Sequence, residues 1–178
     1  NQVNNNSCIN LKNLVAKFSD TSEVIDIICN ELVDEPTVQL GTGQVFRKGV
    51  NPELDLHLEA KQHGTDWIKN FQINERENSG INTLKVGFNN VFGYYIEVSR
   101  LQSSKVPEYF VRKQTLANAE RYTTPELKEI EAKILGAEDK IGEIESNLFS
   151  LLRTRIAQFV AEIQNNSNII SIIDCLQG

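Results

Sequence analysis

The spacing of apolar residues changes along the chain from helical to extended and back to helical. Over residues 11–33 apolar side chains recur at helical spacing, with a break at residues 19–21 and an Asp-Glu-Pro stop at residues 34–36. Two short helices are therefore expected in this stretch. Residues 36–50, where glycines separate single apolar residues, predict a short extended segment and turns that lead to the next helix.

Two longer helices share the same kind of start. Residues 51–54 read Asn-Pro-Glu-Leu and residues 124–127 read Thr-Pro-Glu-Leu. Each combines a capping side chain, a proline whose missing N–H costs nothing at the first helical position, and an acid near the positive end of the helix. The first helix is expected over about residues 52–77, with Gly64 as a weak point. Its apolar face comprises Leu54, Leu58, Ile68 and Phe71.

The second long helix carries a heptad seam, because its apolar residues follow alternating steps of three and four. The seam comprises Leu127, Ile130, Ile134, Ala137, Ile141, Ile144, Leu148 and Leu151, and then shifts by one residue to Leu152, Ile156, Phe159 and Ile163. We expect one helix of about forty residues, which is about 60 Å long at ~1.5 Å per residue. Such a rod must project, and the helix that starts at Pro52 is its expected antiparallel partner.

Between the long helices the apolar residues alternate with a period of two, which is typical of strands. Residues 84–88 and 94–98 predict two strands joined by a turn at residues 89–93, where Asn and Gly can adopt a positive φ. Residues 109–116 and 120–124 add one or two short strands. The expected fold is mainly α with a small antiparallel β subdomain at the tip of a long helical hairpin. Its four parts are residues 1–50, 51–81, 82–124 and 125–178.

Composition indicates a soluble cytoplasmic protein with a net charge of −6, and no apolar run approaches the roughly 18 residues of a membrane span. The chain contains no methionine and starts with polar residues, so we expect it to be a piece of a longer protein. Its three cysteines, Cys8, Cys29 and Cys175, have no paired spacing. Reduced thiols are therefore expected in place of disulfides or a metal site.

The strand region differs in charge from the rest of the chain. It carries six basic residues and three acids, or about +3, within a chain of −6. The basic residues are Lys85, Arg100, Lys105, Arg112, Lys113 and Arg121, and the acids are Glu97, Glu108 and Glu120. Uncharged donors stand between them, a mixture that suits phosphate and sugar contacts better than a fixed base code. An ordinary solvated surface is the alternative that composition alone leaves open.

Other chemistry has little support in the sequence. His57 and His63 do not fit the spacing of a metal-binding motif and fall on different faces of the predicted helix. The stretch Gly41-Thr42-Gly43 is too short for a nucleotide-binding loop, and no nucleophile motif occurs. Trp67 and Phe71 are interpreted as helix-packing residues. We expect no catalytic residue, no metal site and no enzyme activity in this chain.

Two strings carry a specific resemblance. Residues 84–100 (LKVGFNNVFGYYIEVSR) and 107–129 (PEYFVRKQTLANAERYTTPELKE) closely resemble the bacterial mismatch-repair ATPases of the MutS family. They match the region where long lever helices run out to a small β-rich DNA clamp. The resemblance extends more loosely over about residues 30–178. It implies that residues 82–124 are the clamp and that the long helices are the levers.

The resemblance also implies partners that lie outside this chain. The full-length protein would be a homodimer that closes around double-stranded DNA and works with further mismatch-repair proteins. ATP and Mg²⁺ would bind a domain not present here, since the chain has no phosphate-binding loop motif and no cofactor is expected in it. That domain would move the levers. No membrane partner is expected.

Seven residues are predicted to contact DNA. They are Asn89, Lys113, Thr115, Asn118 and Arg121, with Lys105 and Arg112 as weaker candidates. Relatives often carry a basic residue where this chain has Ala117, which implies one fewer phosphate contact here. The alternative function is a structural antiparallel coiled-coil arm whose tip binds a protein. The spread of Lys, Arg and Asn favours DNA, because protein hot spots are usually compact clusters of Tyr, Trp and Arg.

Overall fold

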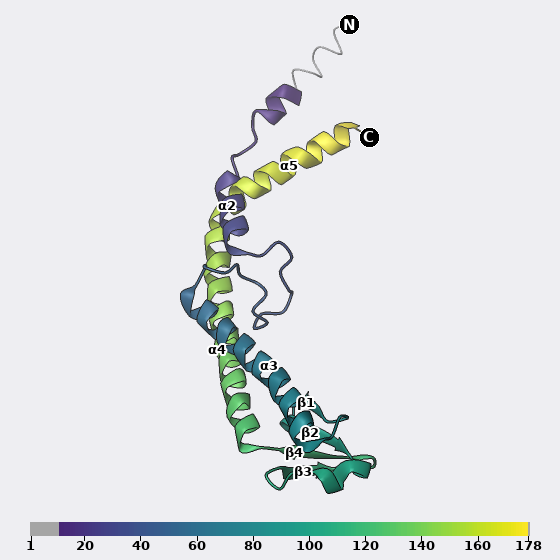
Figure 1. Cartoon of the computed structure of the whole chain (residues 1–178). Helices are drawn as coiled ribbons and strands as arrows, with labels where there is room; N and C mark the ends of the chain where they lie inside the picture. Colours follow the sequence, from purple (N-terminus) through teal and green to yellow (C-terminus); the bar gives the residue numbers. More distant parts are fainter. Residues whose placement is uncertain (1–10, 178) are drawn as a thin grey trace. The chain divides into compact units, whose positions relative to one another are not determined.

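The computed structural model describes residues 11–177 and contains helices together with one four-stranded antiparallel sheet (Figure 1). The predicted order of helix, sheet and helix is confirmed. The elements are α2 (Ser22–Glu31), α3 (Pro52–Ser79), β1 (Lys85–Asn89), β2 (Gly93–Ser99), the 3-10 helix η1 (Arg100–Lys105), β3 (Val111–Thr115), β4 (Ala119–Thr123), α4 (Pro125–Ile156), the 3-10 helix η2 (Ala157–Phe159) and α5 (Val160–Gln177).

The chain forms two compact units. One comprises the described residues up to Leu40, residues 44–50 and the residues from Glu145 onward, and the other comprises residues 41–43 and Asn51–Ile144. The four predicted parts are consecutive ranges of the sequence, whereas these two units are groups of residues in spatial contact. The four-part division therefore stays a prediction. The candidate site lies in the second unit.

In the first unit α2 contacts the end of α4, where Glu31 pairs with Arg155, and lines a pocket together with α5. As predicted, two short helical segments come first, at residues 11–15 and in α2. The predicted extended segment in the connection after α2 is limited to one isolated bridge between Leu32 and Phe46. The connection returns along the end of α2, because Val33 N–H donates to the Val45 carbonyl at 3.1 Å and Arg47 N–H donates to the Glu31 carbonyl at 2.8 Å. These bonds bury Val45 and its neighbour Phe46.

Both predicted helix caps are present in the second unit. The Asn51 side chain accepts a hydrogen bond from Leu54 N–H at 2.9 Å, and the Thr124 hydroxyl accepts one from Leu127 N–H at 3.1 Å. Each cap satisfies a backbone donor that the helix leaves unpaired, which explains why α3 and α4 begin where the sequence places them. Leu54 and Leu127 are both fully buried directly behind these caps.

Gly64 lies where α3 and α4 approach each other. A Cβ on Gly64 would stand 2.5 Å from Ile134 Cγ1, so only glycine permits this contact. The expectation that Gly64 is a weak point in the helix is therefore corrected, since the missing side chain is what allows the packing. One turn away, Lys61 pairs with Glu138 at 3.0 Å. The partner residue number falls from 138 to 134 as the α3 number rises from 61 to 64, so α3 and α4 are antiparallel here.

The sheet has the order β1-β2-β4-β3 and is antiparallel throughout. Its inner face supplies Ile96 and Val98 of β2 and Tyr122 of β4 to a core that also contains Leu84 and Phe110. The predicted period of two is confirmed, because residues that alternate with this set on β2 are only partly buried. The register shifts between Arg112 and Gln114 in β3, which leaves Lys113 in a bulge.

Side chains of both long helices bond to the sheet. On α3, Gln72 accepts from Val86 N–H at 2.7 Å and Arg76 donates to the Leu84 carbonyl at 2.6 Å. On α4, Glu131 accepts from Tyr94 N–H at 3.1 Å. These bonds go to backbone atoms at the two ends of the β1–β2 hairpin, so they fasten that hairpin to the helices.

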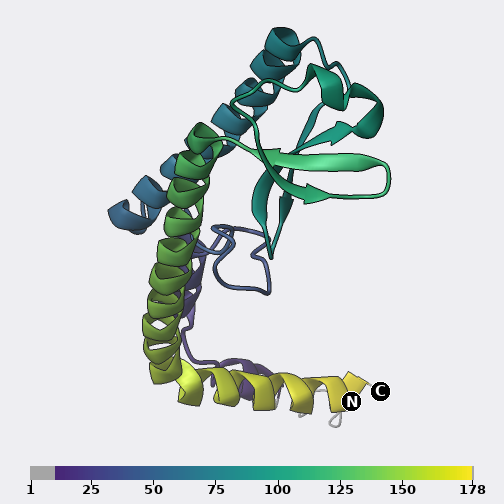
Figure 2. The ribbon, with the colours of Figure 1, turned by 90° about the horizontal axis from the view of Figure 1, so that it is seen from below.

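The predicted single helix of about forty residues is wrong. Helix α4 spans 32 residues, the 3-10 turn η2 follows, and α5 then runs in a new direction (Figures 1 and 2). The apolar shift identified in the sequence is real, since Leu151 is 64% exposed and Leu152 only 2%. A shift of one residue turns the buried face by about 100°, and η2 then tightens the chain five residues later.

Three smaller expectations concern cysteines and aromatic residues. Cys29 and Cys175 are free thiols, as expected, but both are exposed, while Cys8 lies outside the described residues. The Trp67 and Phe71 rings stack with centroids 4.9 Å apart, and Phe71 is buried in the core. The interpretation of these two aromatic residues as packing residues is confirmed.

Candidate nucleic-acid interface

The two hairpins of the sheet present their connections at opposite ends. The β1–β2 turn precedes Gly93 at the start of β2, whereas Ser99 at the end of β2 pairs with Ala119, next to the β3–β4 connection. We call residues 88–93 the turn end and residues 99–105 with 115–119 the loop end. Six residue steps separate them along β2, which corresponds to about 20 Å at ~3.4 Å per residue.

The loop end joins η1 to the β3–β4 connection. Arg100 N–H donates to the Asn118 carbonyl at 3.1 Å, and Leu116 N–H closes the connection on the Ala119 carbonyl at 2.8 Å. Exposed polar or cationic side chains here are those of Arg100, Ser104, Lys105, Thr115 and Asn118, and the apolar side chain of Leu101 is exposed beside them. Figure 2 shows the β3–β4 hairpin extending away from α4. A ligand can therefore approach this connection without displacing a helix of the same unit.

Glu120 is paired with one guanidinium group beside the loop end and feels the charge of a second. Arg112 pairs with Glu120 at 3.3 Å while remaining 61% exposed, and the Tyr122 hydroxyl donates to the same carboxylate. That hydroxyl is the main cause of a lowered pKa of Glu120, to which the charges of Arg112 and Arg100 also contribute. Burial and the bond to Glu120 raise the pKa of Tyr122 to about 12. Two cations against one anion leave a net positive charge here.

The turn end is held by hydrogen bonds of its own. Asn89 Oδ1 accepts from Val91 N–H at 2.8 Å, and Gly93 takes a φ of 71°, as its type predicts. Lys113 reaches across and donates to the Phe92 carbonyl at 3.0 Å. Phe88, Val91 and Phe92 are exposed, with Val91 81% accessible. The turn end is thus an apolar surface with one ammonium group bonded to it.

Arg121 lies between the two ends on the outer face of the sheet. Its Nε donates to Glu97 at 3.0 Å and its Nη1 donates to Gln114 at 3.2 Å. The guanidinium carbon also stands 4.0 Å from the centre of the Tyr95 ring, a cation–π distance. The Arg121 side chain is only 19% exposed.

This arrangement can be compared with known proteins. The family model of MutS family domain IV matches residues 49–140, which is more than half of the chain. The chain belongs to the MutS family. The matched range contains α3, the whole sheet and the first half of α4, so it covers both hairpins and the loop end.

Curated relatives agree with the family model. The chain is 47% identical over 160 residues to the DNA mismatch repair protein MutS of Protochlamydia amoebophila, covering 90% of this chain and 19% of that protein. It is 45% identical over 166 residues to the protein of the same name from Caldanaerobacter subterraneus subsp. tengcongensis, covering 93% and 19%. The chain therefore spans about a fifth of the length of the MutS relatives that it matches.

The residues predicted to bind DNA in this MutS-family chain separate into three groups. Thr115, Asn118 and Lys105 lie at the loop end with Arg112 beside it, Asn89 and Lys113 lie at the turn end, and Arg121 lies between. The prediction omitted Arg100, which the structure brings to the loop end. Arg100 directly follows β2 in the sequence, but this position indicates a place beside Asn118 only if β2 is known to pair with β4.

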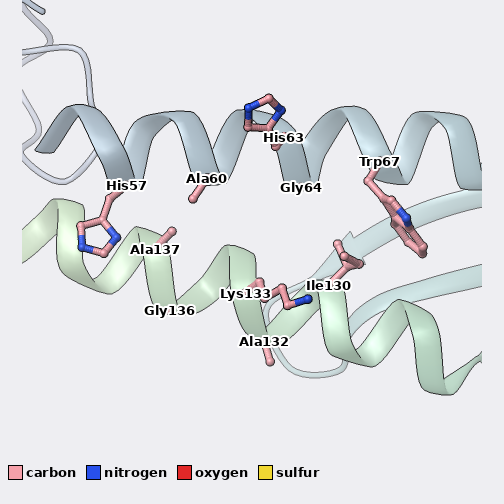
Figure 3. Close-up of a pocket in the computed structure, with 10 residues that line it drawn as sticks. All are labelled: His57, Ala60, His63, Gly64, Trp67, Ile130, Ala132, Lys133, Gly136 and Ala137. Carbon is pink, nitrogen blue, oxygen red and sulfur yellow. The ribbon is translucent and has the colours of Figure 1, made fainter. Parts of the chain in front are cut away.

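A groove between α3 and α4 is a second concave surface of the MutS domain (Figure 3). It has a volume of about 590 Å³ and is lined mainly by small and apolar side chains, including Ala60, Ala137 and Trp67. His57 points toward α4 while His63 points away from it, as their spacing predicted. The two imidazoles do not converge, so the groove does not assemble a polar site.

The described residues contain neither a metal-binding cluster nor a helix that could span a membrane. Across residues 11–177 no three His, Cys, Asp or Glu side chains gather closely enough to hold a metal ion. Within the same range, no helix combines the length and apolar character needed to cross a membrane.

Proposed function

We propose that this chain is the lever and clamp part of a mismatch-repair ATPase and that its loop end grips the backbone of duplex DNA without sequence preference. The observation that carries this proposal is the gathering of Arg100, Thr115 and Asn118 at the exposed loop end, with Arg112 beside it. Guanidinium, hydroxyl and amide groups are the usual donors to phosphate and sugar oxygens. The names of the relatives supply the mismatch-repair context.

The helices fit the role of levers. The sheet is bonded to α3 through Gln72 and Arg76 and to α4 through Glu131, so displacement of either helix pulls on the β1–β2 hairpin. We propose that ATP and Mg²⁺ act on a domain outside this chain, that the whole protein is a homodimer around DNA, and that mismatch-repair proteins dock on it. The helices then carry motion to the clamp.

Titration of labelled duplexes tests the grip. The chain should bind unrelated sequences with similar affinity, with a Kd on the order of 10⁻⁴ to 10⁻⁶ M at physiological salt. The logarithm of the affinity should fall linearly with the logarithm of the salt concentration, because each phosphate contact releases counterions. A strong preference for one duplex at matched salt, or no binding at low salt, would refute the proposal.

The turn end favours a second candidate function, a protein-interaction arm. Phe88, Val91 and Phe92 form an exposed apolar cluster, and such clusters mark protein-binding surfaces more often than DNA grips. The two functions use opposite ends of one sheet. Variants at each end therefore distinguish them, as described in the Discussion.

A further inference from the structure

The Arg121 side chain contacts side chains on both neighbouring strands, which a residue that only binds phosphate does not have to do. It stands on β4, the strand between β2 and β3. Its guanidinium donates to Glu97 on β2 and to Gln114 on β3, and it covers the ring of Tyr95, also on β2. One side chain thus connects three strands on the outer face of the sheet.

We propose that Arg121 is a positioning residue that sets the geometry of the loop end and is not itself a DNA contact. This inference rests on the proposed function. Through Arg121, the uncharged donors Thr115 and Asn118 are held where they can reach sugar and phosphate oxygens. It is an alternative to the sequence prediction of Arg121 as a direct contact, which stays a prediction.

The β-bulge shows why β3 needs such a fixed point. The register shifts at Lys113, so the ladder of hydrogen bonds is interrupted immediately before Gln114. Gln114 is the residue that Arg121 bonds, and Thr115 follows it at the loop end. The bond to Gln114 therefore fixes the register of β3 between its bulge and the connection.

The bond to Glu97 fixes the other side of the loop end. Glu97 lies two residues before Ser99, and Arg100 then starts η1 and bonds to the Asn118 carbonyl. The same guanidinium thus holds the strands that lead into both parts of the loop end. Displacing it would loosen Thr115 and Asn118 together.

Electrostatics argue against a direct contact. The charge of Arg121 is balanced by Glu97 at 3.0 Å, and both side chains are mostly covered. A phosphate would have to approach the Glu97 carboxylate, a like charge, and compete for donors already in use. Arg112, by contrast, is largely exposed and shares its partner with two other groups.

The experiment compares Arg121→Ala with Arg112→Ala in DNA titrations over a range of salt. Arg121→Ala should weaken binding roughly two- to tenfold, the worth of one net hydrogen bond, on every duplex. The slope of log affinity against log salt should not change, because Thr115 and Asn118 carry no charge. Arg112→Ala should lower the magnitude of that slope by ~0.9. A similar drop in Arg121→Ala would overturn the proposal.

Arg121→Lys separates the effect of the charge from that of the side-chain geometry. It also replaces Arg121→Ala as the test variant if thermal unfolding shows that Arg121→Ala does not fold. Lysine keeps the charge but lacks the planar fork that bonds two acceptors and stacks on a ring. It should bind DNA as weakly as Arg121→Ala. Near wild-type affinity in a folded Arg121→Lys variant would make Arg121 a simple phosphate contact.

Glu97→Gln tests the sign of the effect. If Arg121 were a contact masked by Glu97, removal of this negative charge would tighten DNA binding. If Glu97 holds Arg121 in place, Glu97→Gln should weaken binding, and the double variant with Arg121→Ala should lose no more than the worse single variant. Tighter binding by Glu97→Gln contradicts the inference. Failure of the unmodified chain to bind DNA at all would instead reject the proposed function.

Discussion

The two ends of the sheet are built from hairpins of similar size but differ in chemistry. The loop end exposes Arg100, Lys105, Thr115 and Asn118 with one large apolar side chain, Leu101, whereas the turn end exposes the three apolar side chains of Phe88, Val91 and Phe92. Both are organised by local hydrogen bonds, so neither is simply a loose connection. The difference shows that a net charge of about +3 over the strand region is not evenly spread.

The attachments of the two ends differ as well. The turn end is bonded to α4, since Tyr94 N–H donates to Glu131 and a side chain at Gly93 would collide with that carboxylate. The two parts of the loop end are bonded to each other, since Arg100 N–H of η1 donates to the Asn118 carbonyl of the β3–β4 connection. We therefore propose that the turn end is attached to the helices and that the loop end binds the ligand.

The largest effect is expected from the pair Arg100→Ala and Arg112→Ala at the loop end. Loss of two phosphate contacts should reduce the magnitude of the salt slope by about 1.8 and the affinity for any duplex roughly 60-fold at 0.1 M salt. Fluorescence anisotropy at four salt concentrations measures both quantities. The control pair Lys140→Ala and Arg153→Ala on α4 should change neither, and equal losses from the two pairs would leave the loop end without a special role.

A smaller gain is expected from Ala117→Lys, which adds a cation to the exposed β3–β4 connection. One new phosphate contact should raise the magnitude of the slope by ~0.9 and tighten binding roughly eightfold at 0.1 M salt. Val91→Lys adds the same charge at the turn end and is the matched control. If Val91→Lys gains as much as Ala117→Lys, the two ends do not differ in their access to DNA.

Lys113→Ala should have little effect on DNA binding, although Lys113 was predicted to contact DNA. Its ammonium donates to the Phe92 carbonyl at the turn end, away from the loop end. Affinity should change by less than about twofold with the slope unchanged, since surface substitutions away from a binding site usually have small effects. A slope reduced by ~0.9 would return Lys113, and with it the turn end, to the DNA-binding surface.

The smallest effect concerns Glu120 and pH. Because its pKa is lowered in the folded chain, ionised Glu120 stabilises the fold above the unfolded pKa of about 4.3, and this contribution is lost as pH falls through the lower folded value. The stability difference between the parent chain and Glu120→Gln should be constant from pH 6 to 8 and shrink below pH 4. Urea unfolding at each pH measures it. A difference that stays constant down to pH 3 would mean that the carboxylate does not stabilise the fold.

Local features of the fold could be predicted from the sequence, and long-range pairing could not. The caps at Asn51 and Thr124 and the alternation around Ile96 depend on neighbouring residues, so they are visible in a single sequence. The pairing of β2 with β4 joins strands separated by η1 and β3, and alternation within each strand does not specify it. This pairing is what brings Arg100 to Asn118 and Glu97 to Arg121.

Two features of the fold, the bulge at Lys113 and the turn η2, were not predicted from the sequence. The bulge at Lys113 moves one basic side chain away from its sequence neighbour Arg112, although both belong to one polar string. The turn η2 interrupts a helical pattern that has no proline or glycine at that point. In both cases tertiary packing overrides a regular local pattern, and the sequence contains no breaker residue that reveals it.

The close approach at Gly64 has a mechanical consequence. Ile134 fills the space that a side chain on Gly64 would take, so α3 and α4 approach closely here, with about 15 residues of α3 beyond this point on the side of the sheet. That length is roughly 22 Å at ~1.5 Å per residue. A tilt of α3 by a few degrees about the Gly64 contact would displace Gln72 and Arg76 together with the strand that they bond. The displacement of each residue would increase with its distance from Gly64.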